Sequence, residues 1–185
     1  DFDDRVLGDL ASGLAGGPSN AMAVFAVTGA DEQAVDAGVS QLSEFLHMLG
    51  NPVAMNDSRT NNGGFEASDL NKWLHTEFVK ALPYSIRARL TDVTIPTVGE
   101  MFGWDDKWNR DHFVADNDKQ LPLMKQRRNR VAYYNNECEC GWLRNATKKE
   151  FSSARFANVG YGGGDRAYYF VSGYAGVRPE IWLTK

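Results

Sequence analysis

The chain has 185 residues, of which 43% are hydrophobic and 24% are charged, and its formal net charge is -4. This length and balance are typical of one globular domain with a sizeable core, and they exclude a disordered or collagen-like chain. The negative charge gives no general attraction to nucleic acid or anionic membranes, so nucleic-acid binding is a minor expectation. No run approaches the roughly 20 apolar residues of a membrane-spanning helix, so we expect no membrane insertion.

The N-terminal part starts with a glycine-rich stretch, residues 1–20, and a short apolar run, residues 21–27, that suits a buried strand. Apolar residues then recur at steps of four and three over residues 35–49, which predicts an amphipathic helix. We expect residues 1–55 to form an extension, a strand plus this helix, packed on a domain of residues 56–185.

A second amphipathic helix is predicted to begin at Ser68, whose hydroxyl can accept from the exposed amides of a first helical turn. The helix ends before Pro83. Its inward side chains are expected to be Leu70, Trp73, Leu74, Phe78 and Leu82.

Shorter elements are predicted beyond this helix. A helical turn is expected over residues 86–90, and Thr97 with Glu100 forms a capping box for another turn. Residues 103–136 are polar and weakly periodic, which predicts long loops with at most one short element. The C-terminal part is rich in β-forming residues, and strands are predicted at residues 155–159, 167–171 and 176–183. The order of these elements predicts an α+β fold.

Three C-terminal segments form a recognisable pattern: Gly141-Trp142-Leu143-Arg144, residues 154–159, and Gly176-Val177-Arg178-Pro179-Glu180-Ile181-Trp182-Leu183. Upstream, Asp69-Leu70-Asn71-Lys72-Trp73-Leu74 with Phe78, and Ile95-Pro96-Thr97-Val98-Gly99-Glu100, agree with it. Over about residues 60–185 the chain resembles a bacterial and phage family of unknown function whose members end in Gly-Val-Arg-Pro-x-x-Trp-Leu.

That family resembles the C-type lectin fold, which implies two main helices, small antiparallel sheets and long loops. The same broad fold includes the variable proteins of diversity-generating retroelements, in which a hypermutated C-terminal segment forms the ligand surface. The resemblance therefore implies a non-enzymatic recognition protein of a virus or prokaryote. Such a protein would act on a virion or cell surface and bind a protein or other macromolecule of a host or target.

The candidate ligand surface lies in residues 160–174, which contain four tyrosines and five glycines. Rigid amphipathic rings among small adaptable residues are typical of antibody loops. The predicted ligand-binding residues are Tyr161, Asp165, Arg166, Tyr168, Tyr169, Ser172 and Tyr174, with Asn145 and Lys148 as neighbours. A flexible hairpin with chance tyrosines is the alternative interpretation.

Other candidate chemistry is less complete. The segment from residue 103 to residue 119 offers oxygen ligands for calcium in Asp105, Asp106, Asp111, Asp116 and Asp118. The Glu-Pro-Asn or Gln-Pro-Asp signature of sugar-binding C-type lectins is missing, however, so no metal or cofactor is expected. A basic and aromatic stretch, residues 125–134, could meet phosphate or an acidic partner, although a solvated surface is the commoner explanation.

The two cysteines, Cys138 and Cys140, are too close for an ordinary disulfide and too few for zinc without partners elsewhere. Free thiols are expected, which favours synthesis in a reducing cytoplasm. Formylglycine-generating enzymes share the broad fold and use a cysteine pair, but these two cysteines lie upstream of that framework's closing strands. A cysteine enzyme of that kind stays open as an alternative, as does a structural protein of a virion or other assembly.

Several single residues have structural expectations. Trp142, Leu143, Trp182 and Leu183 are expected in the core, and Arg178 in an ion pair that positions the last strand. The histidines His47, His75 and His112 adjoin no nucleophile motif, so each is expected at the surface or in packing.

Overall fold

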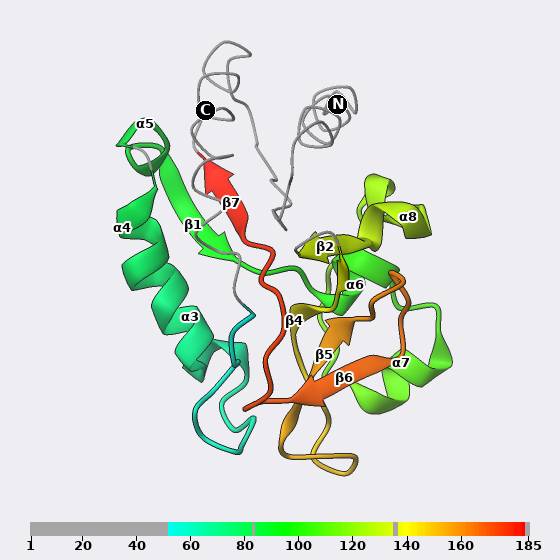
Figure 1. Cartoon of the computed structure of the whole chain (residues 1–185). Helices are drawn as coiled ribbons and strands as arrows, with labels where there is room; N and C mark the ends of the chain where they lie inside the picture. The colour runs from blue at the N-terminus through cyan, green and yellow to red at the C-terminus, as the bar shows by residue number, and fades with distance from the viewer. Residues whose placement is uncertain (1–51, 83, 135–136, 184–185) are drawn as a thin grey trace.

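The computed structural model describes residues 52–82, 84–134 and 137–183 (Figure 1). The strand predicted at residues 21–27 and the helix predicted at residues 35–49 lie outside the described residues. The described part is a mixed α+β body of short helices and small antiparallel sheets, which confirms the α+β class. Within it, no helix has the length and apolar character needed to cross a membrane.

The α-helical part of the main helical stretch begins at the predicted cap, Ser68, after a short 3₁₀ turn. The Ser68 hydroxyl accepts from the Asn71 amide at 3.0 Å. The stretch consists of η3 (Phe65–Ala67), α3 (Asp69–Trp73), η4 (Leu74–Phe78), which is one wider π turn, and α4 (Val79–Ala81). Of the predicted inward side chains, Leu70, Leu74, Phe78 and Leu82 are buried, whereas Trp73 is half-buried. Phe65 of η3 is buried as well and was not predicted.

A two-stranded ladder joins distant parts of the chain, because β1 (Leu90–Thr94) pairs antiparallel with β7 (Glu180–Leu183). The helical turn predicted over residues 86–90 is correct only in part, since α5 (Tyr84–Arg87) ends before β1 begins. Thr91, Val93 and Thr94 are β-branched and suit a strand. Their pairing partner lies at the far end of the chain, so the local pattern does not reveal it.

The region predicted as long loops contains short elements instead. After α6 (Val98–Phe102), whose capping box is confirmed, come α7 (Lys107–His112), η5 (Pro122–Lys125) and α8 (Arg127–Arg130). A small hairpin of β2 (Ala132–Tyr134) and β3 (Glu137–Glu139) follows. None of these elements is long enough to show a hydrophobic period, which is why the loop prediction is wrong here.

The central sheet has the antiparallel order β4-β5-β6, formed by β4 (Gly141–Ala146), β5 (Arg155–Val159) and β6 (Ala167–Phe170). β5 has the predicted bounds and β6 ends one residue early. The predicted last strand is also shorter. Residues 176–179 run past β4, where the Trp142 amide donates to the Gly176 carbonyl at 2.9 Å, and regular pairing starts only at Glu180.

Successive side chains of β4 and β5 point to opposite faces of the sheet and pack into two separate hydrophobic cores. Trp142 and Phe156 join the core under α3, η4, β1 and β7, whereas Leu143 and Ala157 join the core under α6 and α7. Figure 1 shows the α3–α4 helix and the β1–β7 ladder on one side of the central sheet, and α6 and α7 on the other side. Trp142 and Leu143 are buried as predicted, and Trp182 and Leu183 are half-buried. This packing leaves β6 at the rim of the sheet.

Candidate functional site

Exposed aromatic side chains concentrate around β6. Among the described residues, eight large hydrophobic side chains are exposed, and five of them lie between residues 151 and 174. Three are predicted ligand-binding tyrosines: Tyr161 is 60% exposed, Tyr169 43% and Tyr174 69%. We call Tyr161, Tyr169 and Tyr174 the tyrosine face. Exposed apolar side chains that gather in a patch mark interaction sites more often than scattered ones do.

The surroundings of the tyrosine face hold its rings in place. The Tyr169 ring lies 6.1 Å from the Trp142 ring and covers Gly173, where an added Cβ would meet the Tyr169 ring at 2.2 Å. Tyr161 lies beside Cys140 and Glu139, and its electrostatic interactions with these two groups raise the pKa of its phenol. The phenol therefore stays a neutral hydrogen-bonding group.

Cys140 does not have the environment of a reactive thiol. It is buried, and burial followed by the neighbouring Glu139 raises the pKa of its thiol to about 11. Reactive cysteines have lowered pKa values and positive surroundings. Both Cys138, which is exposed, and Cys140 are free thiols.

Tyr168 lies on the opposite face of β6. Its ring stacks parallel to Trp108 at 6.1 Å and meets Phe151 edge-on at 5.0 Å. Trp108 also stacks on His112 at 4.1 Å, which places His112 in ring packing. Alternation along β6 thus divides the predicted tyrosines between two surfaces.

The glycine-rich loop between β5 and β6 is held from outside by two arginines of α8. Arg127 Nε donates to the Gly162 carbonyl at 2.8 Å, and Arg130 Nε donates to the Gly163 carbonyl at 2.9 Å. Two loop bonds, from the Gly160 amide to the Gly164 carbonyl and from the Gly163 amide to the Gly160 carbonyl, close the turn. The basic stretch predicted as a solvated surface therefore also fixes the backbone of this loop.

Asp165 and Arg166 also connect the glycine-rich loop to neighbouring elements. Arg166 has a positive φ of 60° and donates through Nη2 to Asp106 Oδ2 at 2.8 Å. Asp106 in turn caps α7 by accepting from the Trp108 amide at 2.7 Å. Asp165 is half-buried near Arg130. Ser172 is exposed beside the tyrosine face.

The two predicted neighbours lie elsewhere. Asn145 belongs to β4, not to a loop, and is buried. Its Oδ1 accepts from the Val98 amide at 2.7 Å and its Nδ2 donates to the Val114 carbonyl at 2.8 Å. Lys148 is directed to α7, because its Nζ donates to the Arg110 carbonyl at 2.6 Å. Neither residue extends the tyrosine face.

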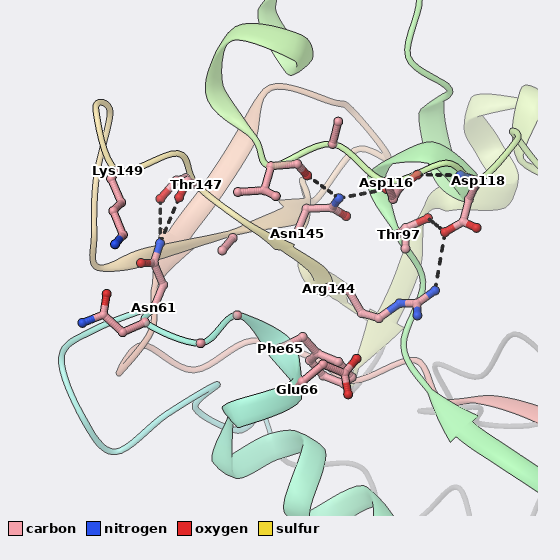
Figure 2. A pocket seen from close by; sticks show the side chains of 16 residues that line it. Asn61, Phe65, Glu66, Thr97, Asp116, Asp118, Arg144, Asn145, Thr147 and Lys149 are labelled. Carbon is pink, nitrogen blue, oxygen red and sulfur yellow. Dashed lines mark hydrogen bonds and ion pairs between the residues drawn. The ribbon is translucent and has the colours of Figure 1, made fainter.

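An open pocket of about 730 Å³ lies where β4 meets residues 61–66, the start of α6 and residues 114–118. Figure 2 shows Arg144 pointing toward Asp118 and Thr97 within it. Arg144 Nη2 is 3.6 Å from both Asp118 Oδ2 and Glu100 Oε2, and its buried Nε has no hydrogen-bond partner among the described residues. No pattern in the sequence predicts this pocket, because its walls come from four separate segments.

Asp116 connects the walls of the pocket. Its carboxylate accepts from four donors: the amides of Gly99 and Asp118, Trp104 Nε1 and Asn145 Nδ2. Three of the other four aspartates considered for calcium are also engaged: Asp111 with Lys107, Asp106 as a cap and Asp118 with Thr97. Across residues 52–183, wherever the structure describes them, no group of three or more His, Cys, Asp or Glu side chains could hold a metal ion.

Arg178 differs from its prediction. It is buried and donates through Nη2 to the Arg130 carbonyl at 2.8 Å. Within the described part of the chain it has no ion pair, so the predicted ion pair is wrong there. A backbone carbonyl at the end of α8 replaces the expected carboxylate, and it links the closing segment to the helix that holds the glycine-rich loop.

Comparisons with known proteins give one match. No curated protein matches the chain, and no solved structure does. The family described as "Domain of unknown function (DUF6273)" matches residues 45–185. The match begins before the predicted domain boundary at residue 56 and covers the pocket, the glycine-rich loop and the tyrosine face. The chain therefore belongs to the DUF6273 family.

Proposed function

We propose that this protein is a non-enzymatic recognition protein that binds a protein or other macromolecule through its tyrosine face. The observation that carries the proposal is the exposure of Tyr161, Tyr169 and Tyr174 on a backbone that other elements hold. Tyrosine supplies large contact area and a hydrogen-bonding tip while it loses only two torsions on binding. Exposed rings on an already ordered backbone reduce the entropy that binding must offset.

The way in which the loop is held also supports a variable ligand surface on a C-type-lectin-like scaffold. The guanidinium groups of Arg127 and Arg130 contact backbone carbonyls of the loop. These contacts do not depend on which side chain stands at position 161 or 165. A segment held in this manner tolerates substitution, as a variable protein of a diversity-generating retroelement requires. We place such a protein on a virion or cell surface.

The test compares single alanine variants of the tyrosine face. Tyr161→Ala and Tyr174→Ala should each weaken capture of ligands from target-cell extracts by about 1 to 3 kcal/mol, because both rings are exposed for contact. Their unfolding free energies should stay within about 0.5 kcal/mol of the parent protein. Quantitative mass spectrometry of captured material and urea unfolding measure the two effects.

Tyr84→Ala is the matched control. Tyr84 is 77% exposed and lies on α5, remote in sequence from the tyrosine face, so its loss should change neither capture nor stability. Equal capture by all three variants and the parent protein would overturn the proposal.

A further inference from the structure

β6 is the edge strand of the central sheet, and most of its outer backbone groups have no partner among the described residues. The Val171 amide donates to the Ala154 carbonyl at 3.0 Å, which makes Phe170 and Arg155 a non-hydrogen-bonded pair of the antiparallel ladder. Because the two kinds of pair alternate along the ladder, Tyr168 and Ala157, two residues further along the strands, also form a non-hydrogen-bonded pair. The Tyr168 amide and carbonyl and the Phe170 amide therefore point away from β5. Within the described residues none of these three groups has a hydrogen-bond partner.

Several common protections against strand pairing are missing from β6 itself. Natural sheets guard their edges with very short strands, charged side chains such as lysine, proline, a bulge or a covering segment. β6 is short, at four residues, but has none of the sequence devices. The sequence of β6, Ala-Tyr-Tyr-Phe, contains neither lysine nor proline, and its pairing with β5 has no register shift. Tyr169 and Phe170 are 43% and 53% exposed and rise from opposite faces of the strand. An added strand would therefore find apolar contact on both faces.

Arg155 gives this edge a charge preference. Its guanidinium carbon lies 4.8 Å from the Tyr168 ring centre and 4.4 Å from the Phe170 ring centre. It forms no ion pair with any described carboxylate, and its side chain donates no hydrogen bond there. The two rings hold the guanidinium in place beside the edge. A carboxylate on an incoming strand could then pair with it through two parallel hydrogen bonds.

We propose that the free edge of β6 binds an extended acidic segment of a protein partner as a fourth strand, with a carboxylate of that segment paired to Arg155. The proposal rests on the proposed function and names its ligand class, since strand addition places the partner against Tyr169 of the tyrosine face. A second copy of this chain fits less well. Its own β6 contains no acidic side chain to offer Arg155.

The probe is a displayed library of random peptides about a dozen residues long, which is enough to span a strand, selected on the full chain. Enriched peptides should carry Asp or Glu in an alternating apolar pattern. Hydrogen exchange at the Tyr168 and Phe170 amides should slow by about tenfold or more when a selected peptide binds, because both amides gain an acceptor. Absence of any enriched peptide would overturn the proposal.

Two variants separate backbone pairing from side-chain contact. Phe170→Ala removes the ring and keeps the amide, whereas Phe170→Pro removes both, and the amide is not used by β5. We expect Phe170→Pro to bind the selected peptide about tenfold more weakly than Phe170→Ala. Arg155→Gln should lower affinity by about tenfold for acidic peptides, and a peptide with Asn or Gln in place of its acid should lose this difference. Melting curves check that each variant is folded. The hydrogen-exchange measurement tests the proposal on the parent protein, so it does not depend on whether a variant folds.

The outcomes distinguish this proposal from the proposed function. Equal affinities of Phe170→Pro and Phe170→Ala, combined with loss of binding in Tyr161→Ala, would leave the tyrosine face as the binding surface and overturn strand addition. Unchanged exchange at Tyr168 and Phe170 in the bound state would have the same meaning. Concentration-dependent dimers of the parent protein that Phe170→Pro abolishes would assign the edge to a second copy and overturn the partner named here.

Discussion

Two carboxylates, the half-buried Asp116 and the buried Glu180, have very different surroundings. Asp116 accepts four hydrogen bonds and joins α6 to β4. Glu180, the first residue of β7, is 1% exposed, and neither of its carboxylate oxygens has a hydrogen-bond partner in the part of the chain that the structure describes. Burial, with the nearby charges of Glu100 and Asp118, raises the pKa of Glu180 to about 8, although Arg144 opposes the shift. The folded protein therefore holds a proton on Glu180 that the unfolded chain releases.

This difference predicts a pH dependence of stability. The pKa of Glu180 is higher in the folded state than the ordinary value of 4.5, so the folded state binds more protons between pH 4.5 and about 8. Stability should fall as pH rises through that window. Glu180→Gln should abolish this part of the fall. The difference in unfolding free energy between the variant and the parent protein should therefore shift in favour of the variant by on the order of 3 kcal/mol from pH 5 to pH 8.5.

Urea unfolding at several pH values measures this effect. Glu150→Gln is the matched control, because Glu150 is an exposed carboxylate and its removal should leave the pH dependence of the parent protein unchanged. The prediction fails if Glu180→Gln and the parent protein lose stability in parallel between pH 5 and pH 8.5.

At the scale of elements, the described helices and strands are short and hold one another through side chains and close backbone contacts. The glycine-rich loop and α8 are the clearest pair. Gly163 has a φ of 69°, and a Cβ at this position would meet the Arg127 carbonyl at 2.6 Å and the Val131 amide at 3.1 Å. Only glycine permits both this backbone conformation and this approach to α8. The loop therefore has its observed position because α8 lies directly against it.

Gly163→Ala should destabilise the protein by about 1 to 3 kcal/mol, since it adds backbone strain and forces the loop from α8. Gly162→Ala provides the comparison. Its Cβ would meet only the flexible end of Arg127, at 3.3 Å from Nη2, so stability should change by less than about 0.5 kcal/mol. Thermal unfolding of the two variants measures the difference, and equal melting temperatures would contradict the account of the loop.

The whole molecule is closed by its C-terminal segment. Residues 176–179 run past β4, and β7 then pairs with β1, so this segment ties the central sheet to the first strand. Val177 and Ile181 are buried in the core under α3 and η4. The same segment contributes Arg178, which contacts α8. Three separate parts of the fold thus depend on the last residues of the chain.

Deletion of residues 176–185 should abolish cooperative unfolding, because it removes Val177, Ile181 and the partner of β1 together. Calorimetry and near-ultraviolet circular dichroism measure the loss. A truncation of residues 184–185 alone keeps all of β7 and should retain the transition of the full chain. An unchanged melting transition after the longer deletion would refute this role of the segment.

Local signals in the sequence predicted the elements whose ends are marked by caps or turns. Ser68 and the capping box of Thr97 and Glu100 mark helix starts, because a cap is formed by residues within one turn. β5 was placed correctly since its flanking turns are visible in the sequence. Periodicity also identified Leu70, Leu74 and Phe78 as core residues. The exposed tyrosines were recognisable by composition alone.

Tertiary structure decided what depends on distant contacts. The strand β1 exists because β7 pairs with it, and the pocket around Arg144 exists because four separate segments meet there. The division of Tyr168 and Tyr169 between two surfaces follows from which face of β6 lies on α7, and the free backbone edge follows from the strand order β4-β5-β6. Sequence patterns report which residues suit an element or a surface. They do not report which distant neighbour will pair with that element, and here that neighbour determines where the candidate site is open.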